Sequence, residues 1–213
     1  MSVGVPAVLS AELPPVGGNS FIECIEIPAQ EWGLKGLAGR FIEISGGPAT
    51  ASLSVCARLV REAQQTGGIA VWVGDSKAGF FPPDLAANGV YLPSLAVVRV
   101  EGSRQVWGAC DTLLRSGGFT LLVADIQGDI RLSLSEQTRL SALAQHHHAA
   151  LVVLTKVARA DYPRGSLVSL RAETEKRRTG HECFACEVRV TKDKRRVPGW
   201  AYKELCRGSD GLC

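Results

Sequence analysis

The chain has 213 residues, which suits one sizeable α/β domain and is short for two. Its low aromatic content of 6% and its 23 glycines favour α/β turns over a β-sandwich. No apolar run reaches the roughly 18 residues of a membrane span, and residues 1–20 lack the basic and apolar regions of a signal peptide. We therefore expect a cytoplasmic protein with no membrane partner, whose seven scattered cysteines are reduced thiols.

The net charge of +3 hides an asymmetry along the chain. Residues 1–155 hold 10 Lys or Arg and 13 Asp or Glu, whereas residues 156–207 hold 14 and 7. The basic last third suits nucleic acid or an acidic protein face. A solvated sheet edge protected by Lys and Arg explains the same pattern equally well.

The pattern predicts a flexible N-terminal segment (1–20), a single domain (21–207) and a flexible tail (208–213). Within the domain, Phe21–Pro28 alternates as a short strand, and Gln30–Gly39 is predicted to be a connector. Apolar runs and helical spacings then alternate as far as residue 155, which predicts right-handed βαβ units and a parallel sheet. The predicted strands are Phe41–Ile44, Ile69–Val73, Leu95–Val100, Leu121–Ala124 and Leu151–Leu154; the predicted helices are Ser52–Gln65, Asp84–Asn88, Gln105–Arg115 and Ser135–His146.

The rhythm changes after residue 155. Leu167–Glu173 and Cys183–Thr191 are predicted to form an antiparallel hairpin around the polar turn Lys176–Gly180, because no helical pattern lies between them. The segment Pro198–Cys213 is predicted to add a strand or to wrap an edge.

The stretch from Gly47 to Ser54 lies where a phosphate-binding loop would follow the first core strand. Such a loop reads G-x-x-x-x-G-K-[ST]: glycines let backbone N–H groups surround the phosphates, the lysine neutralises them and the hydroxyl holds Mg²⁺. Here Gly47 and Ser54 fit, but Ser52 replaces the second glycine and Leu53 replaces the lysine. One interpretation is residual anion binding at the helix N-terminus; the other is a turn retained because the fold needs it.

Four segments in order resemble the RecA recombinase core, over most of the chain from about Gly39 to about Glu204. The resemblance implies a RecA-like α/β fold: a mainly parallel sheet flanked by helices, with a C-terminal antiparallel hairpin. It also implies that Asp125 corresponds to the Walker B aspartate, that Asp75 is the nearest counterpart of the water-activating acid, and that a polar sensor position follows the fifth strand. The four segments are Arg40–Pro48, Leu113–Asp125, Ala150–Lys156 and Glu187–Pro198.

The departures from that family predict a protein that is not an enzyme and has no cofactor. Replacing the loop lysine by Leu53 removes a charge-assisted contact of roughly 1.5–3 kcal/mol. Ser52 and Leu53 together predict that ATP is not hydrolysed. Asp125 then has a second interpretation, as a cap for the turn that follows its strand.

Among RecA-like chains that have lost ATP chemistry, this one is most similar to the ImuA group. That resemblance implies a translesion-synthesis accessory protein of the SOS response that binds an ImuB-like partner, RecA or an error-prone polymerase, at the nucleoid when recruited to damage. Alternatives are a SulA-like division inhibitor that binds FtsZ, and a RecA-paralogue ATPase or DNA-binding protein. The implied mechanism is a RecA-type oligomerisation surface on the third strand or the next helix; its candidate residues are Leu95, Val98, Val100, Val106 and Leu113.

Basic side chains gather at the two predicted turns of the C-terminal part. If the turns converge, they form a patch for a phosphate backbone, with Trp200 and Tyr202 placed to stack on bases; otherwise they are two solvated turns. No metal site is expected from the adjacent histidines His146–His148 or from the single C-x-x-C at Cys183–Cys186. The candidate nucleic-acid residues are Lys176, Arg177, Arg178, Lys192, Lys194, Arg195 and Arg196.

Overall fold

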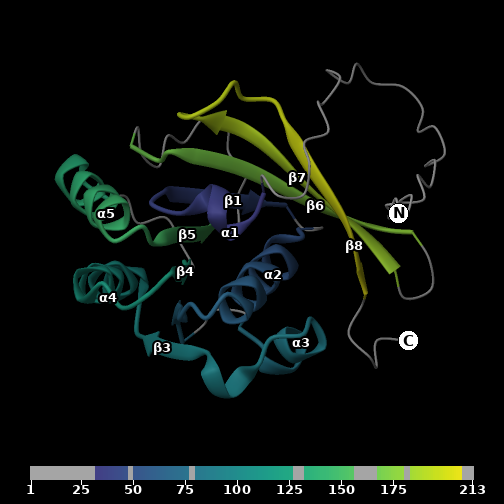
Figure 1. The fold of residues 1–213 in the computed structure, drawn as a ribbon, viewed down its shortest axis with the longest axis horizontal. Coiled ribbons are helices and arrows are strands. Elements are labelled where there is room, and N and C mark those ends of the chain that lie inside the picture. The colour runs from purple at the N-terminus through teal and green to yellow at the C-terminus, as the bar shows by residue number, and fades with distance from the viewer. Residues whose placement is uncertain are drawn as a thin grey trace, which may run out of the picture.

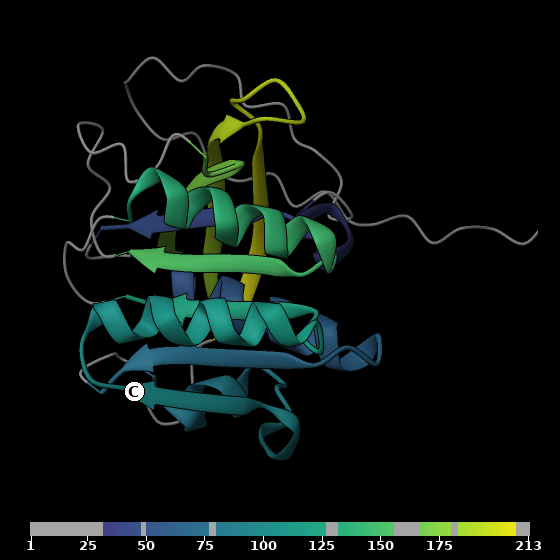
Figure 2. The same cartoon turned by 90° about the vertical axis from the view of Figure 1, so that its left-hand side faces the viewer.

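The computed structural model describes residues 32–47, 50–76, 80–126, 132–155, 167–179 and 183–207. In this part of the chain the strands form one eight-stranded sheet with helices on both faces (Figures 1 and 2). The predicted strand Phe21–Pro28 lies outside the described residues.

The elements follow the predicted alternation. The strands are β1 (Phe41–Gly46), β2 (Ala70–Asp75), β3 (Ala96–Val100), β4 (Leu121–Asp125), β5 (Ala150–Thr155), β6 (Leu170–Arg178), β7 (Cys183–Asp193) and β8 (Ala201–Arg207). The helices are α1 (Leu34–Leu37), α2 (Ser52–Gln65), α3 (Pro82–Ala87), the 3-10 turn η1 (Leu92–Ser94), α4 (Ser103–Ser116) and α5 (Leu134–His146).

The sheet order is β3-β2-β4-β5-β1-β6-β7-β8. From β3 to β6 all neighbouring strands are parallel, whereas β7 pairs antiparallel with both β6 and β8. This confirms the α/β fold class with its C-terminal antiparallel extension. The third predicted strand, β3, forms one edge of this sheet, and its residues are exposed or half-buried.

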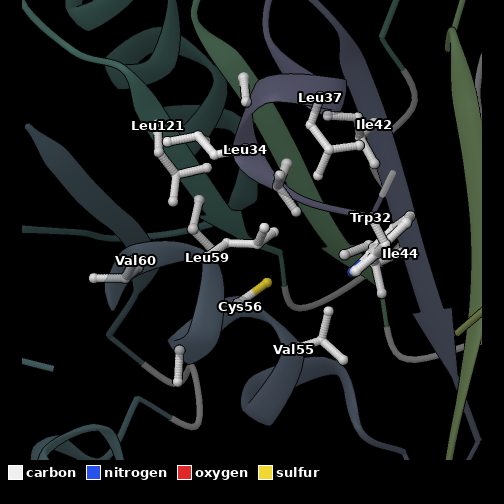
Figure 3. Packing of buried hydrophobic residues seen from close by; sticks show 14 of the residues in the cluster. Trp32, Leu34, Leu37, Ile42, Ile44, Val55, Cys56, Leu59, Val60 and Leu121 are labelled. Carbon is white, nitrogen blue, oxygen red and sulfur yellow. The ribbon is translucent and has the colours of Figure 1, made fainter. Parts of the chain in front are cut away.

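The core lies in two layers, one on each face of the sheet. Figure 3 shows the layer under α1 and α2, where Val55, Cys56 and Leu59 of α2 pack toward the side chains of β1 and α1. The second layer lies under α4 and α5 and includes Val106 and Leu140. Because side chains alternate along each strand, the buried strands supply both layers at once, which explains their continuous apolar runs.

Several boundaries differ from the prediction, and three of the differences bear on the site and its surroundings. Ser133, rather than Ser135, caps α5: its hydroxyl accepts from the Glu136 N–H at 3.3 Å, and the Glu136 carboxylate accepts from the Ser133 N–H at 2.8 Å. The expected connector 30–39 contains the short helix α1, because Leu34 and Leu37 reach the core. Strand β6 continues through Arg178, so Lys176–Arg178 belong to a strand and not to a turn.

A buried ion pair fixes the antiparallel extension to the parallel core. The Arg40 guanidinium, just before β1, donates to the Asp193 carboxylate at 2.5 Å and to the Ser169 carbonyl at 2.9 Å. Asp193 also accepts from the Arg195 backbone N–H at 2.8 Å and from the Trp200 indole at 3.3 Å. The end of β7 is therefore tied to the beginning of β1 through one carboxylate.

Candidate functional site

The counterpart of the phosphate loop is filled by the protein's own hydroxyls. The Thr50 Oγ1 lies 2.5 Å from the Ser52 Oγ and 2.9 Å from the Thr174 Oγ1, and the Ser52 and Thr174 oxygens are 2.8 Å apart. The Ser52 backbone N–H donates to the Thr50 Oγ1 at 3.1 Å. A first-turn N–H that could bind an anion is therefore already engaged by this hydroxyl triad, Thr50, Ser52 and Thr174.

The turn fits so tightly because Gly46 lies beneath the triad. A Cβ on Gly46 would stand 1.9 Å from the Thr50 Oγ1, whereas a Cβ on Gly47 would meet nothing within 4 Å. The predicted loop glycine, Gly47, is exposed, and Ser54 is half-buried. Leu53, at the position of the lysine, has 39% of its surface exposed and supplies no charge. Residues 48 and 49 of the stretch lie outside the described residues.

The two candidate acids lie on opposite faces of the sheet. Asp125 of β4 is the register partner of Gly74 of β2, and both positions face the layer under α2. Asp75 is the next residue after Gly74, so it faces the opposite layer, under α4. The pKa of the Cys56 thiol on α2 agrees with this placement of Asp125. Burial raises that pKa above its usual range, and the nearby Asp125 carboxylate raises it further. The pleat therefore separates the two carboxylates, and the arrangement does not gather them around one phosphate.

The end of β5, where the family resemblance places a polar sensor, also faces away from the loop. Thr155 lies on the α4–α5 side and lines a pocket of about 340 Å³, counted with its open mouth. Its Oγ1 and the Trp107 indole N–H, both buried, have no hydrogen-bond partner among the described residues. Sequence reasoning missed this mainly apolar pocket, since no local signal joins its residues: Phe41, Glu43, Trp107, Ile126, Leu132, Val153, Thr155 and Val168.

Among the described residues, strand β3 is paired on one side only, with β2. The Val100 carbonyl accepts from the Ser76 N–H at 3.0 Å, so Val100 and Val98 direct their main-chain groups toward β2. Alternation along the strand then directs the N–H and C=O groups of Val97 and Arg99 away from the sheet. The Val97 side chain is 41% exposed, and the Arg99 guanidinium lies 5.7 Å from the Phe80 ring.

The predicted docking residues divide into two groups. Val98 and Val100 are half-buried against the layer under α4, and Leu113 of α4 is also half-buried. Leu95 is buried and Val106 is fully buried. The prediction that Leu95 and Val106 present a docking surface is therefore wrong, because both apolar side chains are used by the core. Sequence reasoning missed the exposed Val97. Side chains alternate along a strand, so the sequence could have placed Val97 on the face opposite to that of Val98 and Val100.

The predicted basic residues do not form one patch. Arg178 is the register partner of Phe184 at one end of the β6–β7 pair, and Asp193 is the partner of Leu170 at the other end. Lys176–Arg178 and Lys192–Arg196 thus lie at opposite ends of two long strands, because antiparallel pairing separates them. Trp200 and Tyr202 are also buried in the core, so the prediction that they stack on bases is wrong.

The described side chains contain no cluster of three His, Cys, Asp or Glu residues that would hold a metal ion. The His146 and His147 rings contact each other edge to face at 4.7 Å. His181, next to the C-x-x-C, lies outside the described residues. No helix within the described ranges is long and apolar enough to cross a membrane.

Comparison with known proteins finds a partial similarity. No family model matches the chain. A segment of 87 residues, 41% of this chain, is 33% identical to protein RecA of Laribacter hongkongensis strain HLHK9. The matched segment spans 24% of that RecA protein's length. The similarity and the mainly parallel sheet together support a RecA-like relationship.

Proposed function

We propose that this chain is a non-catalytic RecA-like adaptor that binds an extended segment of a protein partner along the outer edge of β3, which pairs only with β2 among the described residues. The observation that carries the proposal is the outward direction of the Val97 and Arg99 main-chain groups on a strand paired on one side. An added strand would gain hydrogen bonds of about 0.5–1.5 kcal/mol each from those groups.

Features of the loop and of the two neighbouring aspartates support a role without catalysis. The hydroxyl triad engages the first helix N–H, Leu53 supplies no positive charge, and Asp75 and Asp125 face opposite sides of the sheet. Each feature opposes the binding and hydrolysis of a nucleoside triphosphate. Function on this interpretation lies in protein contacts, with no bound cofactor.

The biological setting of the proposal comes from the family resemblance. An ImuA-like role would place the adaptor in SOS-induced translesion synthesis, with an ImuB-like protein supplying the added segment and with RecA and an error-prone polymerase as further partners. These partners are proposed, and the similarity to RecA supports the RecA-like part of the proposal.

The edge can be tested with one residue and two substitutions. The Val97 N–H points away from β2, so Val97→Pro removes this donor without removing a ladder bond. Proline is also tolerated on edge strands. Val97→Ala trims the same side chain and keeps the N–H. We expect Val97→Pro to weaken binding of a purified ImuB-like partner at least tenfold in calorimetric titration, and Val97→Ala to weaken it less than threefold.

Three outcomes would contradict the proposal. If both variants bind as the unchanged protein does, β3 is not the docking edge. Tight ATP binding, or turnover that is lost in Asp125→Ala, would instead favour the RecA-paralogue ATPase. Inhibition of FtsZ polymerisation by the chain would favour the SulA-like alternative.

A further inference from the structure

The turn after β7 presents positive charge with its acid turned inward. Lys192, Lys194, Arg195 and Arg196, here called the basic tip, lie within five positions. The acid among them, Asp193, is buried and bound to Arg40. Lys194, Arg195 and Arg196 are exposed. The tip is therefore more positive at the surface than its sequence indicates.

The basic tip is held in one backbone shape. The Lys194 N–H donates to the Ser169 carbonyl at 2.9 Å, and the Arg195 N–H donates to Asp193. The Arg195 guanidinium reaches the Ala38 carbonyl at 3.3 Å, and the Gly199 N–H donates to the Val190 carbonyl at 2.9 Å. A ligand that binds the tip therefore does not have to order its backbone.

Like charges crowd the base of the tip. Arg171 of β6 is the register partner of Lys192, and burial together with the neighbouring Lys194 and Arg171 lowers the pKa of Lys192. Arg171 is also paired with Glu43 at 2.9 Å, so one of these charges is partly balanced. At the other end of the hairpin, Arg177 makes two hydrogen bonds to Glu175, at 3.0 and 3.2 Å, and the Lys176 ammonium lies 4.2 Å from the Phe184 ring.

We propose that the basic tip binds the phosphodiester backbone of a nucleic acid without reading its sequence. Phosphate contacts need charge and reach, which exposed Lys and Arg on a fixed turn provide. A polyacidic peptide is the other ligand that such charges suit.

This site is independent of the β3 edge. In both views the turn between β7 and β8 lies at the top of the molecule and β3 at the bottom (Figures 1 and 2). The sheet order puts six strands between β3 and β8, with β7 next to β8. One chain would thus bind a protein segment at one end of its sheet and nucleic acid near the other.

The test compares two triple variants of the full chain that remove equal charge. One carries Lys194→Gln, Arg195→Gln and Arg196→Gln; the other carries Lys176→Gln, Arg177→Gln and Arg178→Gln. Binding of labelled oligothymidine of about 30 nucleotides, and of a duplex of equal length, is followed by fluorescence anisotropy from about 50 to 200 mM salt. Thermal unfolding of each variant verifies that it folds, with Lys194→Gln alone as a milder replacement.

We expect the tip variant to bind at least tenfold more weakly at 50 mM salt and to reduce the single-strand salt slope by roughly 0.7 for each phosphate that it no longer neutralises. The other variant should stay within threefold of the unchanged protein. Equal losses of affinity in both variants would overturn the proposal, since only net charge would then matter. Failure of the unchanged protein to bind at 50 mM salt, or polyglutamate binding as tight as DNA binding, would overturn it as well.

Discussion

Replacing Asp193 by asparagine tests how much the link between β7 and β1 stabilises the fold. The Arg40 and Asp193 side chains are 4% and 0% exposed, so solvent screens their interaction little. Burial lowers the pKa of Arg40 and Asp193 opposes that effect, but an arginine stays protonated in either case. In Asp193→Asn the guanidinium would remain buried and charged without its carboxylate.

The expected cost follows from that burial. Breaking a buried ion pair from one side costs about 3–5 kcal/mol, because an uncompensated charge is left inside. The matched control is Arg115→Met. Arg115 also bonds to an aspartate, Asp111, at 2.8 Å, but it is 56% exposed. A pair of that kind contributes about 0–1 kcal/mol.

Urea unfolding followed by circular dichroism measures both variants against the unchanged protein. A loss below about 1 kcal/mol in Asp193→Asn, no larger than in the control, would refute the reasoning. A double variant, Arg40→Met with Asp193→Leu, sharpens the test. It removes both charges, so we expect it to be less destabilised than Asp193→Asn alone.

Two further predictions concern the loop and acid stability. Gly46→Ala should destabilise the protein by about 1–3 kcal/mol in urea unfolding, because its Cβ would stand 1.9 Å from the Thr50 Oγ1. Gly47→Ala, with open space around its Cβ, should change stability by less than about 0.5 kcal/mol. Equal effects of the two substitutions would show that the turn is not tightly packed. Although burial opposes it, hydrogen bonds from Arg40, Arg195 and Trp200 leave the pKa of Asp193 lowered. The contribution of Asp193 to folding stability is therefore present at neutral pH. It is lost as the pH falls from the ordinary pKa of an aspartate toward the lowered pKa of Asp193. Melting temperature measured downward from pH 6 should fall more steeply for the unchanged protein than for Asp193→Asn, and parallel curves would contradict the assignment.

Helix and strand positions were predictable where the pattern is local. The α2 prediction, Ser52–Gln65, agrees with the structure at both ends, since its apolar spacing and the following glycines are signals within one segment. The predicted hairpin appears as β6 and β7, and of the two alternatives for the segment after Pro198 the added strand appears, as β8. The cap of α5 was placed two residues too late, at Ser135, although Ser133 with Glu136 three positions on is the serine that satisfies the capping-box pattern.

The functional positions depended on contacts that no local pattern contains. Val106 fits a docking helix as well as a buried one by sequence, and only the packing of α4 on the sheet assigned it to the core. Asp75 and Asp125 are the last residues of the neighbouring strands β2 and β4, and both were candidate acids. Their separation comes from the β2–β4 register, which one residue of slip would reverse.

By itself the sequence determined that this chain folds as an α/β domain with a phosphate-loop turn that has lost its lysine, because residue type and spacing carry that information directly. The tertiary structure decided what occupies the turn. Thr174 comes from a strand more than one hundred residues away, and its hydroxyl completes the triad with Thr50 and Ser52. The structure also decided that Asp193 turns inward to Arg40, a contact across 153 positions. Such contacts are set by strand order and register, and these follow from burying the whole sheet at once.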